Sequence, residues 1–159
     1  MISYEENEKK FNFRVGAIIE SPDKKKILIH KLSHFDFWLL PGGRVEMMED
    51  TEKSIVREIK EELGVKCDID KLISITENFF TMGDKTYHEI AFNYLLKVAN
   101  DASIIQEKEE FAGIEGEKYR YKWIDKDLLG KINFKPDFII PILQNMPKEI
   151  IHIIKDDRK

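Results

Sequence analysis

The chain has 159 residues, of which 42% are hydrophobic and 35% are charged. This balance excludes a disordered protein and predicts one folded domain over residues 1–159. No apolar run is long enough to cross a bilayer, and the N-terminal segment is charged where a signal peptide would be apolar. We therefore expect a cytoplasmic protein without a membrane partner. The net charge of −4 and the lack of a long Lys/Arg block argue against long nucleic acid as a partner.

The first part of the chain predicts two strands, a glycine turn and a helix. Residues 11–20 and 26–32 are rich in β-branched and aromatic residues, and a turn at 21–24 separates them. A Pro-Gly-Gly break at 41–43 leads toward a helix over residues 50–63, where apolar residues recur every four positions. Gly64 follows at once, where helices commonly end.

The second part alternates strands with short helical segments. Strands are predicted at 71–80, 86–98, 118–124 and 149–155, an irregular acidic loop at 100–117, a short helical turn at 125–130, and a helix beginning near Pro136. Strands dominate around one amphipathic helix, which predicts an α+β fold with a mixed sheet packed against helices.

Three carboxylates share one strip of the central helix. With about 100° between successive residues, Glu62 lies about 40° from Glu58 and Glu61 about 60° the other way. Like charges at this spacing repel one another, whereas a hard divalent cation among them would be stabilising. On the helix alone, an ordinary solvated acidic face explains the pattern equally well.

The flanking residues decide between these interpretations. The pattern G-x5-E-x7-R-E-U-x-E-E-x-G-U, in which U is apolar, is complete in Gly43, Glu49, Arg57, Glu58, Ile59, Glu61, Glu62, Gly64 and Val65. It resembles the Nudix box at every fixed position over residues 43–65. The resemblance implies a Nudix-like α/β/α sandwich with a mixed β-sheet between helices. It also implies a pyrophosphohydrolase similar to the MutT-like enzymes.

The resemblance further implies a role for each box residue. Glu58, Glu62 and Glu61 are the expected ligands of Mg²⁺ or Mn²⁺. Glu58, Glu61 and Arg57 form the expected catalytic group, in which Arg57 pairs with Glu49 and orients the carboxylates. The general base is either Glu61 or a glutamate of the acidic loop. The loop candidates are Glu107, Glu109, Glu110, Glu115 and Glu117.

Candidate substrate-binding residues stand next to the box. Gly42 and Gly43 allow the backbone to approach a ligand, and Arg44 suits a phosphate. Trp38 is our candidate for stacking on a base, with Phe35 and Phe37 as alternatives to it, although aromatic residues in such segments usually belong to the core.

The remaining reactive or aromatic residues are expected to be mainly structural. Cys67 cannot form an internal disulfide and is expected to be buried. Phe79 and Phe80 should face opposite sides of a strand, one in the core and one toward a pocket or a dimer contact. The histidines show no paired metal-ligand spacing, and His88 beside Glu89 is the best outside candidate for a functional one; the others are His30, His34 and His152. Trp123 is expected to pack.

The implied substrate is a small nucleotide, namely a nucleoside diphosphate linked to a moiety X. A nucleoside triphosphate, a nucleotide sugar and a dinucleotide all remain open for X. The alternatives are a catalytically inactive Nudix domain that senses a nucleotide, and an RNA 5′-pyrophosphohydrolase. The resemblance to the family is also consistent with a homodimer.

Overall fold

The computed structural model describes residues 1–158. Its strands are β1 (Ser3–Glu6), β2 (Lys9–Ile19), β3 (Lys26–Leu32), β4 (Gly42–Arg44), β5 (Cys67–Met82), β6 (Lys85–Val98), β7 (Phe111–Gly113), β8 (Gly116–Asp125) and β9 (Ile151–Asp156). Its α-helices are α1 (Thr51–Leu63) and α2 (Ile140–Gln144), and its 3-10 helices are η1 (Ser103–Gln106), η2 (Lys126–Lys131) and η3 (Asp137–Ile139).

The strands form two sheets. The larger has the order β1-β2-β6-β5-β9, with β4 also paired to β2. It is mixed, because β2–β6 and β5–β9 are parallel and the other pairs are antiparallel. The smaller sheet, β3-β8-β7, is antiparallel.

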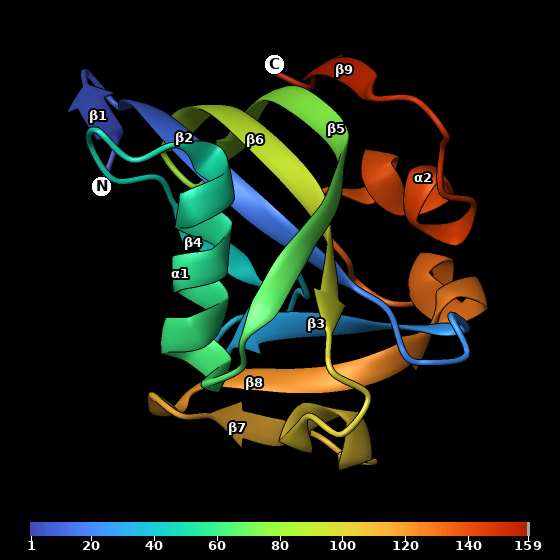
Figure 1. The fold of residues 1–159 in the computed structure, drawn as a ribbon. Helices are drawn as coiled ribbons and strands as arrows, with labels where there is room; N and C mark the ends of the chain where they lie inside the picture. Colours follow the sequence, from blue (N-terminus) through green and yellow to red (C-terminus); the bar gives the residue numbers. More distant parts are fainter. Residues whose placement is uncertain (159) are drawn as a thin grey trace.

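Two hydrophobic cores lie on opposite faces of these sheets. Along β2, Ala17 and Ile19 belong to the core under α1, whereas Ile18 points to the core that contains Leu143 of α2. The two helices accordingly lie on opposite sides of the strands (Figure 1). The expected α+β sandwich with a mixed sheet between helices is confirmed.

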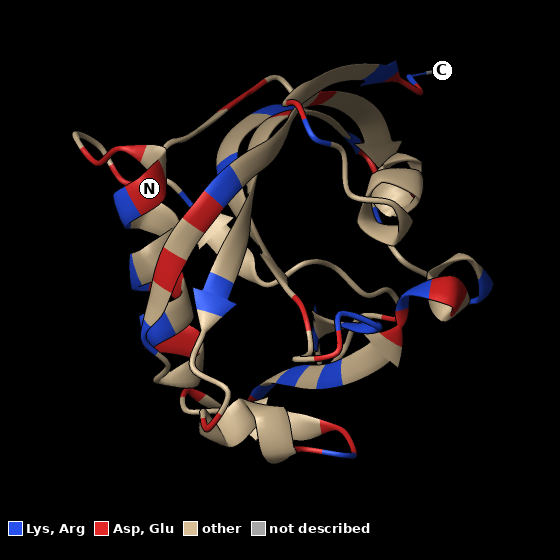
Figure 2. Cartoon of the chain, turned by 45° about the vertical axis from the view of Figure 1, so that its right-hand side comes forward, with Lys and Arg blue, Asp and Glu red and all other residues tan. Residues whose placement is uncertain are grey.

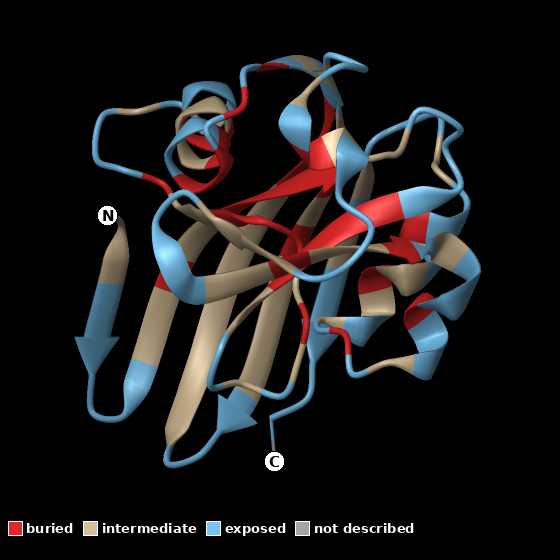
Figure 3. Ribbon diagram, turned by 90° about the horizontal axis from the view of Figure 1, so that it is seen from below, coloured by how far each residue is buried: buried red, intermediate tan, exposed pale blue. Residues whose placement is uncertain are grey.

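Helix α1 begins and ends where the sequence predicts. The Asp50 side chain accepts a hydrogen bond from the Lys53 amide at 2.9 Å, and Gly64 ends the helix with a φ of 68°. Its buried face points to the sheet (Figure 3) and includes Glu62 among apolar residues. None of the helices in residues 1–158 is long and apolar enough to cross a membrane.

The acidic segment 100–117 is more ordered than expected. It contains η1 and β7, and β8 already begins at Gly116. Ile104 of η1 is 4% exposed, and its carbonyl accepts a hydrogen bond from the Trp123 indole at 2.8 Å. A few apolar residues therefore dock this charged segment onto β8. The same bond confirms that Trp123 packs.

Candidate active site

A cleft of about 970 Å³ runs from the C-terminal half of α1 across one face of β2, β6 and β5. Its walls include Glu58, Glu61 and Glu62, together with Gly42, Gly43 and Arg44 of β4. Acidic side chains outnumber basic ones along these walls, and both signs are interspersed over the whole chain (Figure 2). A bound cation would thus be needed to offset the repulsion between these walls and a phosphate chain.

Strand β4 brings the glycine turn against the carboxylates. Gly43 pairs with Val15, and a Cβ atom on Gly43 would lie 2.4 Å from the Glu58 carboxyl carbon. Gly42 has a φ of 154°, and a Cβ atom there would lie 2.0 Å from the Val15 carbonyl oxygen. Only glycine therefore allows the carboxylate of Glu58 to lie against this backbone.

Arg57 organises the acidic side chains, as the resemblance implied. Its guanidinium donates to both carboxylate oxygens of Glu49 at 2.9 Å, and also to Glu58 at 3.0 Å and Glu61 at 3.1 Å. These hydrogen bonds hold the pKa of Glu49 at about 2 and raise the pKa of Arg57 above its usual range. The loop before α1 is thereby tied to the helix.

Glu62 is the most unusual member of the acidic group. It is 5% exposed, and among residues 1–158 its Oε2 atom is buried without a hydrogen-bond partner. Burial raises its pKa well above the ordinary value, and the charges of Glu58 and Glu115 raise it further. Burial also raises the pKa of Glu58. An unpartnered buried carboxylate in an acidic environment fits a cation-binding group.

Glu61 differs from the other two carboxylates. Its side chain is 51% exposed and is held by Arg57, whereas that of Glu58 is 16% exposed. Within the described chain, no three His, Cys, Asp or Glu side chains stand together as a complete ligand set. The three carboxylates share the cleft, as expected, and Arg57 donates hydrogen bonds to two of them, Glu58 and Glu61.

His30 lines the cleft beside Glu62, and Tyr121 lies next to Glu62 in the core. His30 is 3% exposed, and its Nδ1 atom lies 4.0 Å from Glu62 Oε2. Neither His30 Nδ1 nor the Tyr121 hydroxyl has a hydrogen-bond partner within residues 1–158. Burial lowers the pKa of His30 to about 3, with a smaller effect of Arg14, so its imidazole is neutral at physiological pH. His30 was expected to be structural and Tyr121 was not singled out, because both lie on strands outside the box.

Two arginines face each other across β2 and β4. Arg14 and Arg44 are register partners, and both line the cleft. Arg44 Nε is buried without a partner in the described part of the chain, and Arg14 makes no ion pair with any of residues 1–158. Like charges directly opposite each other are destabilising, which suits a pair that binds an anion. Arg44 was an expected phosphate contact, whereas Arg14 was not singled out from the sequence.

The structure places Trp38 outside the cleft, which corrects its expected stacking role. Trp38 is 6% exposed and belongs to the core with Phe134, and Lys31 and Lys122 lie over its ring. Phe35 and Phe37 do line the cleft, with stacked rings 5.0 Å apart. The backbone bridges of residues 38–39 to Phe134 and His30 turn the indole inward.

The other aromatic and reactive residues divide into those that line the cleft and those that do not. Phe80 lines the cleft and stacks on Tyr87, whereas Phe79 packs against His88 on the other face of β5. Neither phenylalanine is in the core. His88 also meets Phe11 and does not line the cleft, although Glu89 does. Cys67 is buried, as predicted, and burial raises the pKa of its thiol to about 11.

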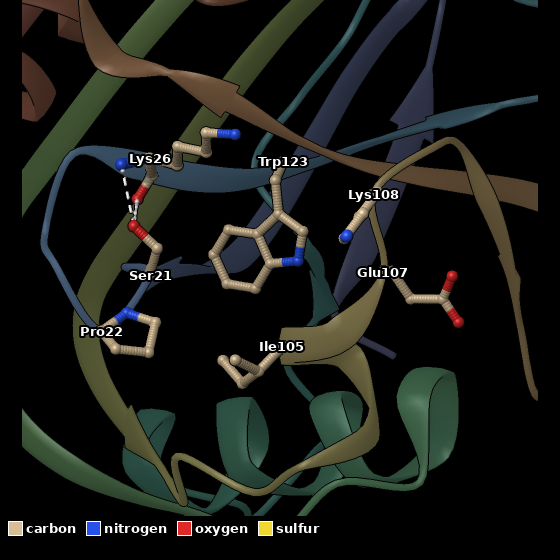
Figure 4. Close-up of a pocket in the computed structure, with 7 residues that line it drawn as sticks. All are labelled: Ser21, Pro22, Lys26, Ile105, Glu107, Lys108 and Trp123. Carbon is tan, nitrogen blue, oxygen red and sulfur yellow. Dashed lines mark hydrogen bonds between the residues drawn. The ribbon is translucent and has the colours of Figure 1, made fainter.

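Of the loop glutamates, Glu115 is the one that lines the cleft. Its charge contributes to the raised pKa values of both Glu58 and Glu62. Glu110 and Glu117 pair with Arg120 instead. Glu107 lines a separate hollow of about 360 Å³ next to Trp123 (Figure 4).

The fold and the site together define an α+β domain with an acidic helix at the edge of a large cleft. The model of the NUDIX domain matches residues 10–144. An 8-oxo-dGTP diphosphatase of Buchnera aphidicola is 31% identical over 152 residues, and the match covers 93% of each chain. The chain belongs to the Nudix family.

Other relatives match over shorter segments. Nudix hydrolase 1 of Caenorhabditis elegans is 41% identical over 69 residues, which are 40% of this chain and 19% of that protein. The mouse diphosphoinositol polyphosphate phosphohydrolase 3-alpha is 31% identical over 56% of this chain and 55% of its own length. A MutT Nudix hydrolase structure from Burkholderia pseudomallei has a TM-score of 0.64 and 22% identity, covering 86% of this chain and 98% of the other. That likeness shows the fold.

Proposed function

We propose that the protein hydrolyses the pyrophosphate bond of a nucleoside diphosphate linked to another moiety, in a reaction that depends on Mg²⁺ or Mn²⁺. The observation that carries this proposal is the buried, unpartnered carboxylate of Glu62 beside Glu58 in an acidic cleft. Both residues would hold the cation, with Glu61 as a further ligand. Bound there, the cation would neutralise phosphate oxygens and lower the pKa of a water molecule.

Glu115 is our choice for the general base, with Glu61 as the alternative. Glu115 is exposed and reaches the cleft from the segment before β8, so it can exchange protons with solvent. Glu61 accepts a hydrogen bond from Arg57, and that contact restricts its movement. A base must lie within hydrogen-bond reach of the attacking water.

Arg14 and Arg44 would bind the phosphate oxygens of the substrate, because guanidinium groups match them in shape and charge. Since acidic side chains outnumber the remaining basic ones along the walls of the cleft, the site suits a short phosphate chain better than a densely phosphorylated inositol. The stacked pairs Phe35–Phe37 and Phe80–Tyr87 offer apolar surface for a base.

The proposal is tested by phosphate release from a panel of nucleoside triphosphates, nucleotide sugars and dinucleotides, with and without Mg²⁺ or Mn²⁺. We expect turnover of at least one compound class only when the cation is present. Glu58→Gln and Glu62→Gln should each reduce kcat by at least about 100-fold while the circular dichroism spectrum is unchanged. Full activity of both variants would contradict the ligand assignment, and no turnover of any nucleotide would contradict the proposed reaction.

A second variant tests the phosphate contacts. Arg14→Ala removes one charge-assisted hydrogen-bonding group, so we expect kcat/KM to fall by about 10- to 100-fold. Lys122→Ala is the matched control, because Lys122 lies over Trp38 outside the cleft. Equal kinetics for the two variants would show that Arg14 does not contact the substrate.

A further inference from the structure

Two residues that line the cleft, Glu62 and His30, each have a buried polar atom without a hydrogen-bond partner within residues 1–158, namely Glu62 Oε2 and His30 Nδ1. The hydroxyl oxygen of the core residue Tyr121, next to Glu62, is a third such atom. Their residues are 5%, 3% and 0% exposed. Native proteins rarely leave one such atom unpartnered, so three at one place indicate that something binds there.

The His30 ring is held in a fixed orientation. It stacks on Tyr119 with an interplanar angle of 7° and packs against Tyr121 at 45°, with ring centroids 5.7 and 5.5 Å away. Its Nδ1 atom faces Glu62 Oε2 at 4.0 Å, which is too far for a direct hydrogen bond. Two atoms that bind one cation at about 2.1 Å each with a tetrahedral angle lie about 3.4 Å apart, so one ion would draw His30 and Glu62 together by about 0.6 Å to bridge them.

We infer that His30 is a nitrogen ligand of the divalent cation that Glu62 binds, so that this site prefers Mn²⁺, Co²⁺ or Zn²⁺ to Mg²⁺. The inference rests on the proposed function, because it concerns the same cation. Carboxylates and water suit Mg²⁺, whereas an imidazole adds affinity for transition metals. Tyr121 would donate a hydrogen bond from its hydroxyl group to Glu62 or to a water molecule bound to the ion.

The test is electron spin-echo envelope modulation spectroscopy of Mn²⁺ bound to the full chain, which detects nitrogen atoms that coordinate the ion. The variant His34→Gln/His88→Gln/His152→Gln keeps His30 as its single histidine. We expect nitrogen modulation from this variant and a change of its frequencies when histidine is labelled with ¹⁵N. Modulation that is absent, or that does not respond to the label, overturns the inference; a water molecule between His30 and Glu62 would give that result.

Calorimetric titration separates this inference from the proposed function. His30→Gln should weaken Mn²⁺ binding by about 10-fold and leave Mg²⁺ binding nearly unchanged. His152→Gln is the control, because His152 is exposed and pairs with Glu77 at the edge strand β9. Wild-type chain that binds Mn²⁺ without nitrogen coupling contradicts the role of His30 alone. Wild-type chain that binds neither cation contradicts both proposals.

Discussion

Glu62 occupies a position where an acidic side chain is costly unless a cation is bound. Its carboxyl group is buried against a tyrosine and a histidine, and its pKa is raised well above the ordinary value by burial and by two neighbouring carboxylates. In the metal-free protein, at pH values between the pKa of Glu62 in the unfolded state and its raised pKa in the folded state, the folded state therefore keeps a proton that the unfolded state has released. Stability should decrease as the pH rises above about 4.5, the region where an unfolded glutamate ionises.

Glu62→Gln removes this cost because the amide is neutral at every pH. In the presence of a chelator at pH 8, we expect the variant to melt at least about 2–4 °C above the wild type, which corresponds to about 1 kcal/mol for a chain of this size. The difference should shrink toward pH 4, where the wild-type carboxyl group is protonated in both states. A variant that melts below the wild type at pH 8 would show that the charge of Glu62 is already compensated.

At the scale of elements, the site depends on the contact between β4 and α1. The glycine turn reaches Glu58 only because β4 pairs with β2 and because Gly43 has no side chain. Gly43→Ala should displace the Glu58 carboxylate and reduce kcat by about 10- to 100-fold, while the fold is retained. Gly130→Ala is the control, since a Cβ atom at Gly130 would meet nothing within 4 Å. Equal activities of the two variants would contradict the role of this contact.

The elements themselves were largely predictable, whereas several site residues were not. The apolar period of four, the Asp50 and Gly64 ends and the complete box predicted α1 and its carboxylates, because these signals are local. His30 and Arg14 reach the cleft only through the pairing of β2 with β6 and of β3 with β8. Such long-range register is not encoded in short spacings. Glu115 was one of five loop candidates, and nothing in the sequence separated it from the other four. The predicted stacking role of Trp38 was wrong because residue type alone does not tell which way a side chain points.

At the scale of the whole molecule, a sandwich with two hydrophobic cores holds a cleft in whose walls acidic side chains outnumber basic ones. The cores lie on both faces of the sheets, so strands from distant parts of the sequence present their polar residues at one place. A divalent cation should bind the folded chain but not the unfolded chain, and it should therefore raise the melting temperature of the wild type.

Calorimetric titration of Mg²⁺ and of Mn²⁺ into the metal-free chain tests the central claim most directly. The account predicts saturable uptake by the wild type and its loss in both Glu58→Gln and Glu62→Gln. Uptake that is absent from the wild type, or that survives unchanged in both variants, would contradict it.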